Sequence, residues 1–592
     1  MSAFSLFLLS TPMRADEKPW IEVKSPHFRL ITNGERSDGL HVLQRFELMR
    51  AVFAAQPGFK LDAPAPLLII AARDERTMKR LLPGYVAHSI PLPGGLYEHG
   101  WEREYAVVRL DVIKIDPETY HSVYHEYVHS LLHINFQWLP DWLDEGLAEF
   151  YGCTGFIGDK IQVGALPADF RIRMLKSMIL IPFNDFLASR MYTRNPSQTF
   201  ESYIQAWALT HFLMLSPTMD SGQRLGKFLQ LLGQGTPQKK AFQEAIGPFD
   251  EVQKQYETYV HKLTFPIREG PAPAKLGESD FRTRTLEPGE TEAELATWFI
   301  RSHEWEPMRQ DTAVSLQKGP KLSLAHEASG FLLYNEGHDQ DALREFSTSV
   351  ELDNRNYVAL FAKIMVSPSN DPQILYGQLN QVIDLKPDFA PAYIELARIN
   401  FSKGDLRLAL ALSRKAEQIE PFRAGYRVLI AKILLAMHRP AEAAAEAAYV
   451  ADRWGGPDRE EAMEVWNSIP AADRHVQEPT EPESAKEGAM WQNVEGTVKE
   501  VRCDGLDFAI TLEVKGQGQT FKTKGFPVGF SDTLWVGSDH FTPCFHVQGL
   551  RAVLKYRPPK DNTYAGDLVG AGFRDGLSVQ PVNAGVQANS GQ

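Results

Sequence analysis

The segment from residue 121 to residue 151 limits the possible fold more than any other part of the chain. It contains His121, His125, His129 and His133 at four-residue steps, followed by the stretch WLDEGLAEF. Side chains four residues apart lie on one face of an α-helix, so the histidines form a single stripe. WLDEGLAEF has apolar residues at helical spacing, which predicts a second helix. The turn NFQWLP between them predicts a helical hairpin with imidazoles on one arm and carboxylates on the other.

One pair in this histidine stripe has the spacing of a metal site. His125 and His129 enclose the sequence HEYVH, in which both imidazoles can reach one Zn²⁺ at about 2.0–2.1 Å. Glu126 is rotated by about 100° from His125 around the helix axis, so its carboxylate lies beside the ion and can hold a water molecule bound to zinc. The pairs that His121 and His133 would form contain serine in place of this glutamate. Both are therefore expected to support the ligands from outside or to lie on the surface.

The second helix offers a third ligand. Glu145 and Glu149 lie four residues apart, on a face away from the apolar residues of that helix. A catalytic zinc has three protein ligands and one open position, and Glu145 would complete the set with His125 and His129. Glu149, one turn further, could accept a hydrogen bond from the far nitrogen of a ligating histidine and fix its tautomer. The sequence therefore predicts a zinc site with an open position.

HEYVH followed by WLDEGLAEF resembles the motifs of the gluzincin metallopeptidases, and the chain is most similar to bacterial peptidase-MA-like proteins that carry tetratricopeptide repeats. The resemblance implies a zincin-like domain with Zn²⁺ as cofactor, a peptide or protein as substrate, and hydrolysis of a peptide bond as the reaction. It implies that His125, His129 and Glu145 are the ligands and that Glu126 is the general base. Glu149 matches the acidic position that supports a ligand in thermolysin-like enzymes.

The resemblance extends over roughly residues 20–265. The gap to the third ligand is shorter than in the aminopeptidases, and their Gly-Ala-Met-Glu-Asn motif is absent, so aminopeptidase specificity is not expected. Tyr203 resembles the position of the residue that stabilises the oxyanion, with His211 as the other candidate and a plain packing role for Tyr203 left open. The strand EYAVVRLDV before the histidine helix resembles the strand along which zincins bind an extended peptide.

Periodicity upstream of the histidine helix predicts an α+β unit. WIEVKSPHFRLITN contains two strand-like runs around a Ser-Pro turn, LHVLQRFELMRAVFAAQ has helical spacing, and PLLIIAARDE predicts a buried strand. ERTMKRLL predicts a helix and EYAVVRLDV a further strand. We therefore expect a zincin-like domain at 19–265 and a linker at 266–290, where Pro, Gly and charged residues are frequent.

Residues 291–475 contain an internal repeat. Small residues recur at a spacing of about 34 residues, as between Ala397 and Ala431, and this spacing resembles the tetratricopeptide repeat. Small side chains at these positions let two helices approach closely. The segment 355–387, which ends within the sequence DLKPDF, is expected to be a degraded copy. The resemblance implies an α-helical tetratricopeptide-repeat array with a surface for a protein partner.

The C-terminal part has a different pattern. An acidic linker is expected at 476–489, where the sequence includes VQEPTEPESAKEGA. At 490–574 apolar residues alternate, as in FAITLEV and AVLKYR, which predicts a small C-terminal β-barrel or sandwich. The last residues, 575–592, are expected to form a disordered tail. Cys503 and Cys544 could pair in an oxidising compartment or remain reduced thiols.

Charge and hydropathy argue against two classes of partner. A formal charge of −13 and a pI near 5.8 leave no electrostatic footprint for a phosphate backbone, so no nucleic acid is expected as a partner. No stretch after the N-terminus approaches the ~18 apolar residues of a membrane span. Residues 1–18 resemble a signal peptide without a basic start, and a frayed cytoplasmic N-terminus is the alternative. A signal peptide would make the protein extracytoplasmic, either periplasmic or secreted.

Two functions are consistent with these patterns in a multidomain α+β chain. The leading one is a zinc-dependent endopeptidase whose repeats recruit or orient a protein substrate. The alternative is a non-catalytic interaction scaffold, in which the repeats bind a partner and the zincin-like domain is a relic. A relic has no physical need for Glu126, and this favours the enzyme.

Overall fold

The structure is a computed structural model that describes most of the chain. The described residues are 19–55, 58–87, 92–113, 118–167, 169–187, 196–262, 265–272, 275–302, 304–336, 338–367, 369, 371–454, 456–479, 492–504, 507–522, 529–530, 548–557, 559 and 564–574. The expected signal peptide and C-terminal tail lie outside these residues, as do most of the expected acidic linker and Cys544. The possible pairing of Cys503 with Cys544 therefore also falls outside the described part of the chain.

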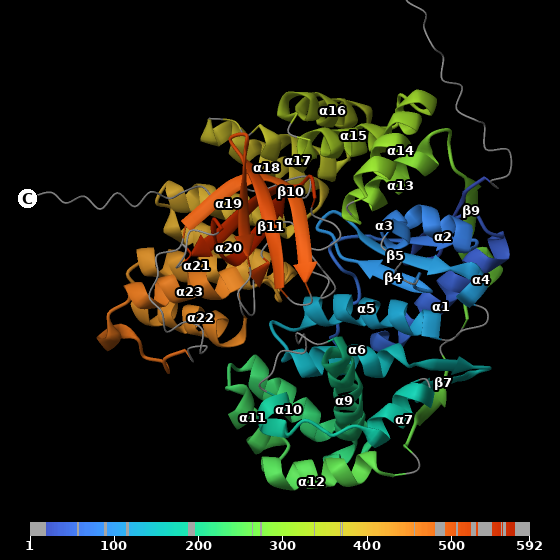
Figure 1. The fold of residues 1–592 in the computed structure, drawn as a ribbon, viewed down its shortest axis with the longest axis vertical. Helices are drawn as coiled ribbons and strands as arrows, with labels where there is room; N and C mark the ends of the chain where they lie inside the picture. Colours follow the sequence, from blue (N-terminus) through green and yellow to red (C-terminus); the bar gives the residue numbers. More distant parts are fainter. Residues whose placement is uncertain are drawn as a thin grey trace, which may run out of the picture.

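A six-stranded sheet forms the centre of the N-terminal unit, with the strand order β4-β5-β3-β2-β1-β9 (Figure 1). β2, β3 and β5 run parallel, and the other neighbours are antiparallel. The strands are β1 (Ile21–Lys24), β2 (Arg29–Thr32), β3 (Leu67–Ala72), β4 (Gly95–Glu98), β5 (Glu104–Arg109) and β9 (Arg282–Thr285). The four strands expected before the histidine helix are confirmed as β1, β2, β3 and β5.

β4 is a strand that the sequence did not predict, and it changes the expected peptide-binding edge. β5, the strand of EYAVVRLDV, has β3 on one side and β4 on the other. Both edges of β5 are therefore occupied, and the expectation that β5 offers its edge to a peptide is wrong. The outermost strand on this side of the sheet, among the described residues, is β4.

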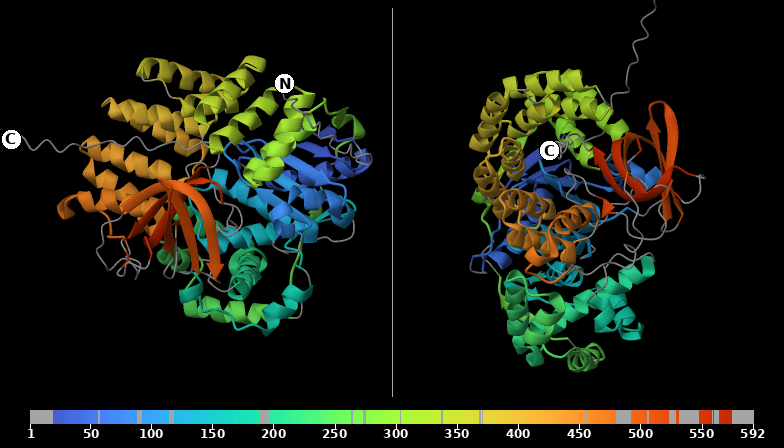
Figure 2. Two further views of the ribbon diagram at one scale, coloured as in Figure 1. Left: turned by 45° about the horizontal axis from the view of Figure 1, so that its top comes forward. Right: turned by 90° about the vertical axis from the view of Figure 1, so that its left-hand side faces the viewer.

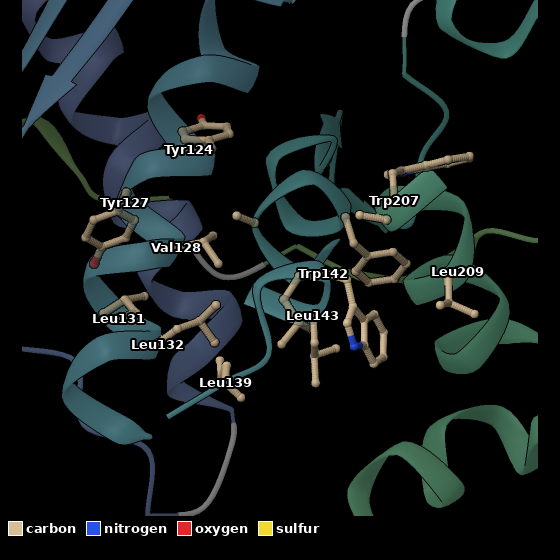
Figure 3. Packing of buried hydrophobic residues seen from close by; sticks show 14 of the residues in the cluster. Tyr124, Tyr127, Val128, Leu131, Leu132, Leu139, Trp142, Leu143, Trp207 and Leu209 are labelled. Atoms are coloured by element: carbon tan, nitrogen blue, oxygen red, sulfur yellow. The ribbon is translucent and has the colours of Figure 1, made fainter. Parts of the chain in front are cut away.

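Helices cover the sheet and extend below it. They are α1 (Arg36–Ala54), α2 (Glu75–Leu81), α3 (Pro83–Ala87), α4 (Leu110–Ile113), α5 (Glu118–Asn135), α6 (Asp141–Gly152), α7 (Asp169–Ser177), α8 (Phe183–Phe186), α9 (Pro196–Leu215), α10 (Gln223–Gly233), α11 (Gln238–Ala245) and α12 (Phe249–Val260). Figure 3 shows α6 between α5 and α9, where Leu131, Leu143 and Trp207 belong to one buried cluster. The helical hairpin predicted from residues 121–151 is therefore confirmed as α5 and α6.

The segment 266–290, expected to be a linker, instead adds strands to the N-terminal unit. β8 (Arg268–Pro271) pairs with β7 (Lys160–Val163), which also pairs with β6 (Gly155–Ile157). β9 pairs with β1 at the far edge of the main sheet. The linker prediction is wrong here because an edge strand such as RTRT in β9 is exposed at every residue and shows no apolar alternation.

The repeat region consists of helices that follow one another through short loops. They are α13 (Glu290–Arg301), α14 (Trp305–Lys318), α15 (Ser323–Asn335), α16 (Asp339–Leu352), α17 (Tyr357–Val366), α18 (Pro372–Leu385), α19 (Ala390–Ser402), α20 (Leu406–Ile419), α21 (Ala424–Ala436), α22 (Pro440–Arg453) and α23 (Gly456–Ser468). The expected degraded copy at 355–387 forms the complete pair α17 and α18. A small residue does allow close packing at Gly330 of α15, because a Cβ there would lie 2.5 Å from the ring of Phe346 on α16.

Each face of the N-terminal sheet belongs to a hydrophobic cluster, and one of the two clusters includes the repeat region. Leu30, Ile69 and Val108 belong to a buried cluster that includes residues of α1 and α5. Their neighbours along the strands point to the other face of the sheet. Ile70 and Tyr105 on that face join a cluster that includes residues of α2, α13, α15 and α17. The repeat region is therefore packed on the sheet rather than attached only through the chain.

The C-terminal strands form a closed barrel, one of the two predicted alternatives. The strands are β10 (Gln492–Asp504), β11 (Asp507–Val514), β12 (Gln517–Lys522), β13 (Gly529–Phe530), β14 (Arg551–Arg557) and β15 (Gly566–Arg574). β12 pairs with both β11 and β15, which closes the sheet. Trp305 of α14 packs against the core of this barrel.

The repeat helices curve around part of the N-terminal unit. The right-hand view of Figure 2 shows them as an arc from yellow to orange, with blue elements of the N-terminal unit on its inner side. Near the C-terminal end of the arc, the indole N–H of Trp138 donates to the carbonyl oxygen of Arg453 in α22 at 3.2 Å. None of the helices in the described ranges combines the length and the apolar character required to cross a bilayer.

Candidate metal centre

α5 and α6 bring two imidazoles and one carboxylate together. His125 Nε2 lies 3.1 Å from His129 Nε2 and 3.2 Å from Oε2 of Glu145, and His129 Nε2 lies 3.5 Å from the same oxygen. All three residues are buried. Zinc–ligand bonds of about 2.0–2.1 Å in a tetrahedral arrangement separate neighbouring ligand atoms by roughly 3.3–3.4 Å. The three distances are close to this separation, so the donor set fits a tetrahedral zinc ion.

The far nitrogens of both histidines also face carboxylates. Nδ1 of His129 lies 3.1 Å from Oδ1 of Asp144, and Nδ1 of His125 lies 3.4 Å from Oε1 of Glu149. A carboxylate beside Nδ1 favours the tautomer that carries its proton on Nδ1. In that tautomer both Nε2 atoms direct lone pairs toward each other and toward Glu145. A cation placed among these three acceptors would satisfy all of them.

The outer histidines of the stripe bind the same two carboxylates. Nε2 of His121 lies 3.1 Å from Oε2 of Glu149, and Nε2 of His133 lies 2.9 Å from Oδ2 of Asp144. Glu149 also accepts a hydrogen bond from the guanidinium of Arg171 at 2.8 Å. The sequence predicted that Glu149 lies behind a ligand but gave no sign of the same role for Asp144, whose partners are known only once α6 is packed against α5.

The electrostatics of the cluster favour positive charge between the side chains. Burial acts to lower the pKa of His125, but the nearby carboxylates of Glu145 and Glu149 outweigh burial and raise this pKa to about 10. Burial also acts to lower the pKa of His129, but Asp144 and Glu145 outweigh burial and raise this pKa overall. Burial acts to raise the pKa of Glu145, whereas the nearby side chains of His129 and His125 lower it to about 2. A divalent metal therefore has to displace protons when it binds.

Glu126, the expected general base, is buried on α5 beside a histidine that the sequence did not predict. Nε2 of His99, which follows β4, lies 4.0 Å from Oε2 of Glu126, and its Nδ1 lies 3.3 Å from Oε1 of Glu104. Glu104 accepts hydrogen bonds from the hydroxyls of Tyr97 at 2.6 Å and Ser130 at 2.9 Å. Burial acts to lower the pKa of His99, whereas Glu104 and Glu126 raise it overall. No local motif pointed to His99, because Glu126 belongs to α5 and only the packing of α5 against β4 brings the two side chains together.

Of the two candidates for an oxyanion donor, Tyr203 is the one that contacts a predicted zinc ligand. The centre of its ring lies 6.1 Å from that of His125. His211, further along α9, is fully buried and hydrogen-bonds with the hydroxyl of Tyr259 at 2.7 Å and the carbonyl oxygen of Gly164 at 3.0 Å. Burial lowers the pKa of His211 to about 4. His211 is thus a neutral core residue, and Tyr203 remains the candidate donor.

Comparisons with known proteins found similarity to repeat proteins. The chain matches no protein-family model and no curated protein. It is similar to YrrB, described as a TPR protein with an unusual peptide-binding site, with 14% identity and a TM-score of 0.25, covering 30% of this chain and 90% of that one. TTC0263, a thermophilic TPR protein of Thermus thermophilus, is 16% identical with a TM-score of 0.25, covering 31% of this chain and 98% of that one. MamA of Desulfovibrio magneticus RS-1 is 16% identical with a TM-score of 0.24, covering 30% of this chain and 96% of that one. The repeat architecture described above rests on the helix pairs of the chain itself.

Proposed function

We propose that the protein is a zinc-dependent hydrolase of peptide bonds. The observation that carries the proposal is the approach of His125, His129 and Glu145, whose ligand atoms lie 3.1, 3.2 and 3.5 Å apart in a buried setting. Two imidazoles, one carboxylate and an open position are the donor set of catalytic zinc, whereas structural zinc has four protein ligands. Glu126, next to His125 on α5, supplies the general base that such a centre needs.

Each side chain around the centre has its own role in the proposed reaction. Zinc, when bound, polarises the scissile carbonyl and makes water more acidic. Glu126 removes a proton from the attacking water and delivers it to the nitrogen of the leaving amine. The hydroxyl of Tyr203 donates to the oxyanion that develops on the carbonyl. Asp144 and Glu149 keep the ligating imidazoles in one tautomer and orientation.

The sheet supports a binding mode for an extended peptide. β4 is the outermost strand on its side of the sheet and pairs with β5 only, among the described residues. A peptide can add to such an edge through main-chain hydrogen bonds. β4 is followed by His99, which lies beside Glu126. A peptide aligned on β4 would therefore pass the general base.

The proposal is tested by metal analysis together with peptide hydrolysis. We expect one zinc per chain and cleavage of members of a peptide library. Glu126→Gln should keep the zinc and lose activity by about 10²–10⁴-fold, because it removes the proton acceptor but no ligand. His129→Ala should lose both zinc and activity. Absence of stoichiometric zinc in metal-replete protein, or full activity of Glu126→Gln, would refute the proposal.

The second candidate function is a protein-interaction scaffold, and the helix pairs of the repeat region favour it. Arrays of this kind present extended surfaces to protein partners. In this case Glu126→Gln would behave as wild type in the cell, whereas disruption of the repeats would abolish capture of the partner. The location outside the cytoplasm is part of our proposal for either function. N-terminal sequencing of the purified protein tests it, because removal of residues 1–18 is expected after export.

A further inference from the structure

The hairpin between β4 and β5 inserts an aromatic side chain into the repeat region. Trp101 is buried, and the centre of its ring lies 6.2 Å from that of Phe331, 5.7 Å from that of Phe361 and 5.8 Å from that of Phe389. Phe331 is on α15, Phe361 is on α17, and Phe389 immediately precedes α19. These are the first helices of three successive pairs, so Trp101 is held by three repeats at once.

Two ion pairs fix the same hairpin. A terminal nitrogen of Arg301, at the end of α13, lies 2.9 Å from a carboxylate oxygen of Glu102. Arg103 donates to Glu327 of α15 at 2.7 Å. At Gly100, a Cβ would lie 2.3 Å from the carbonyl oxygen of Arg103, so the turn requires glycine. The repeat region therefore holds the hairpin through two ion pairs and three aromatic contacts.

The same hairpin carries His99 into the candidate metal centre. His99 is two residues before Trp101, and its ring lies between Glu104 and Glu126 at the distances given above. Glu104 is tied to α5 through its hydrogen bonds with Ser130. Trp101 and His99 therefore link the repeat region to the general base through a few residues of rigid chain.

This inference rests on the proposed hydrolysis of peptides. We propose that His99 is a positioning residue for Glu126 and that the repeat region holds His99 in place through Trp101. The ion pair with His99 directs one carboxylate oxygen of Glu126, so that the other can face the attacking water. Misplacement of a reacting group by about 1 Å can cost about 10²-fold in rate, so the position of Glu126 has to be enforced. The repeat region is then part of the catalytic unit.

The zinc-ligand candidates and the carboxylates behind them lie outside this hairpin. His125 and His129 come from α5, Glu145 comes from α6, and the carboxylates behind the imidazoles, Asp144 and Glu149, are also on α6. A change in the hairpin should therefore alter the turnover number while zinc content stays at the wild-type value. This separation distinguishes positioning of the base from general damage to the centre.

The test compares variants on both sides of the contact. His99→Phe, which keeps a ring of similar size but no charge, should lower kcat by roughly 10–100-fold with little change in KM. Phe389→Ala, which changes the repeat region, should also lower kcat. Trp101→Ala should lower it as well. Trp101→Phe should recover most of the activity, because an aromatic ring still fills the site. Trp466→Ala is the matched control, because it removes an equally buried tryptophan from α23 and should leave kcat unchanged.

A readout that does not need activity completes the test. In Phe389→Ala, amide hydrogen exchange at 99–104 should become faster, while exchange in α5 and α6 and the zinc content stay as in the wild type. Unchanged exchange at 99–104 would refute the proposal that the repeat region holds this hairpin in place. If the wild type is active and His99→Phe has the same kcat, the positioning role of His99 is refuted, whereas the proposed hydrolysis of peptides is not. A wild type that holds zinc but cleaves no peptide would overturn the proposed function, and with it the role of His99.

Discussion

The crossing of α6 and α9 gives a sharp prediction at Gly146, the residue after Glu145. A Cβ at Gly146 would lie 2.1 Å from Oγ1 of Thr210 and 2.7 Å from the carbonyl oxygen of Ala206, both on α9. Thr210 is fully buried and β-branched, so its side chain cannot rotate away freely. The oxygen of Ala206 belongs to the helix backbone. Gly146→Ala therefore requires α6 to move away from α9.

The magnitude follows from two opposing effects. Overpacking of a well-packed core costs about 1–3 kcal/mol, and a backbone clash belongs at the upper end of that range. Replacement of a glycine within a helix by alanine stabilises the helix by about 1 kcal/mol. We expect a net loss of about 2 kcal/mol in the stability of the α5–α6–α9 packing. Displacement of Glu145 should also weaken zinc binding by roughly 10-fold or more, as for changes that disturb ligand orientation.

The assay uses a matched glycine in another helix. Gly226 lies within α10, and a Cβ there would meet nothing within 4 Å, so Gly226→Ala should stabilise by up to about 1 kcal/mol. Hydrogen exchange in α6 and α9 measures local stability in a chain of several domains, and competition with a chelator measures zinc affinity. Adding Thr210→Ala to Gly146→Ala should recover only part of the loss, because the contact with Ala206 remains. A Gly146→Ala protein with wild-type exchange and zinc affinity would refute the reasoning.

Three further predictions concern other positions in the chain. Asp144→Asn should weaken zinc binding by about 10–100-fold, measured by chelator competition, because it disturbs the tautomer and orientation of a ligand; unchanged affinity would contradict this. Gly330→Ala should destabilise the first repeats by about 1–3 kcal/mol, because its Cβ meets the ring of Phe346, whereas Gly377→Ala in α18 has open space and should not; hydrogen exchange in α15 and α16 distinguishes the two. The folded-state pKa of His211, about 4, lies below its ordinary value of 6.5, so the unfolded chain binds this proton more tightly. Stability should therefore fall by roughly 3 kcal/mol as pH decreases from about 6.5 to about 4, and His211→Leu should flatten this slope in denaturant midpoints; an equal slope in both proteins would contradict the assignment.

The parts of the site that could be predicted from the sequence all depend on local spacing. His125, His129 and Glu126 belong to one helix, whose periodicity alone places the two imidazoles on one face and the acid beside them. Glu145 required one further step, the return of the chain through a short turn, and α5 and α6 do bring it to the two histidines. Asp144 could not be predicted, because adjacent positions on α6 differ by about 100° and only the packing of α6 decides which one faces α5.

The sequence by itself determined those helices and strands that have apolar periodicity, since this periodicity is a property of a few consecutive residues. Only the tertiary structure decided how those segments meet. β9 pairs with β1 through backbone hydrogen bonds that leave no apolar pattern in RTRT, so composition alone indicated a linker. His99 reaches Glu126 because Trp101 is held by Phe331, Phe361 and Phe389, which come from repeats more than two hundred residues later in the chain. Contacts of this kind depend on the packing of distant surfaces, and no local pattern of residues encodes them.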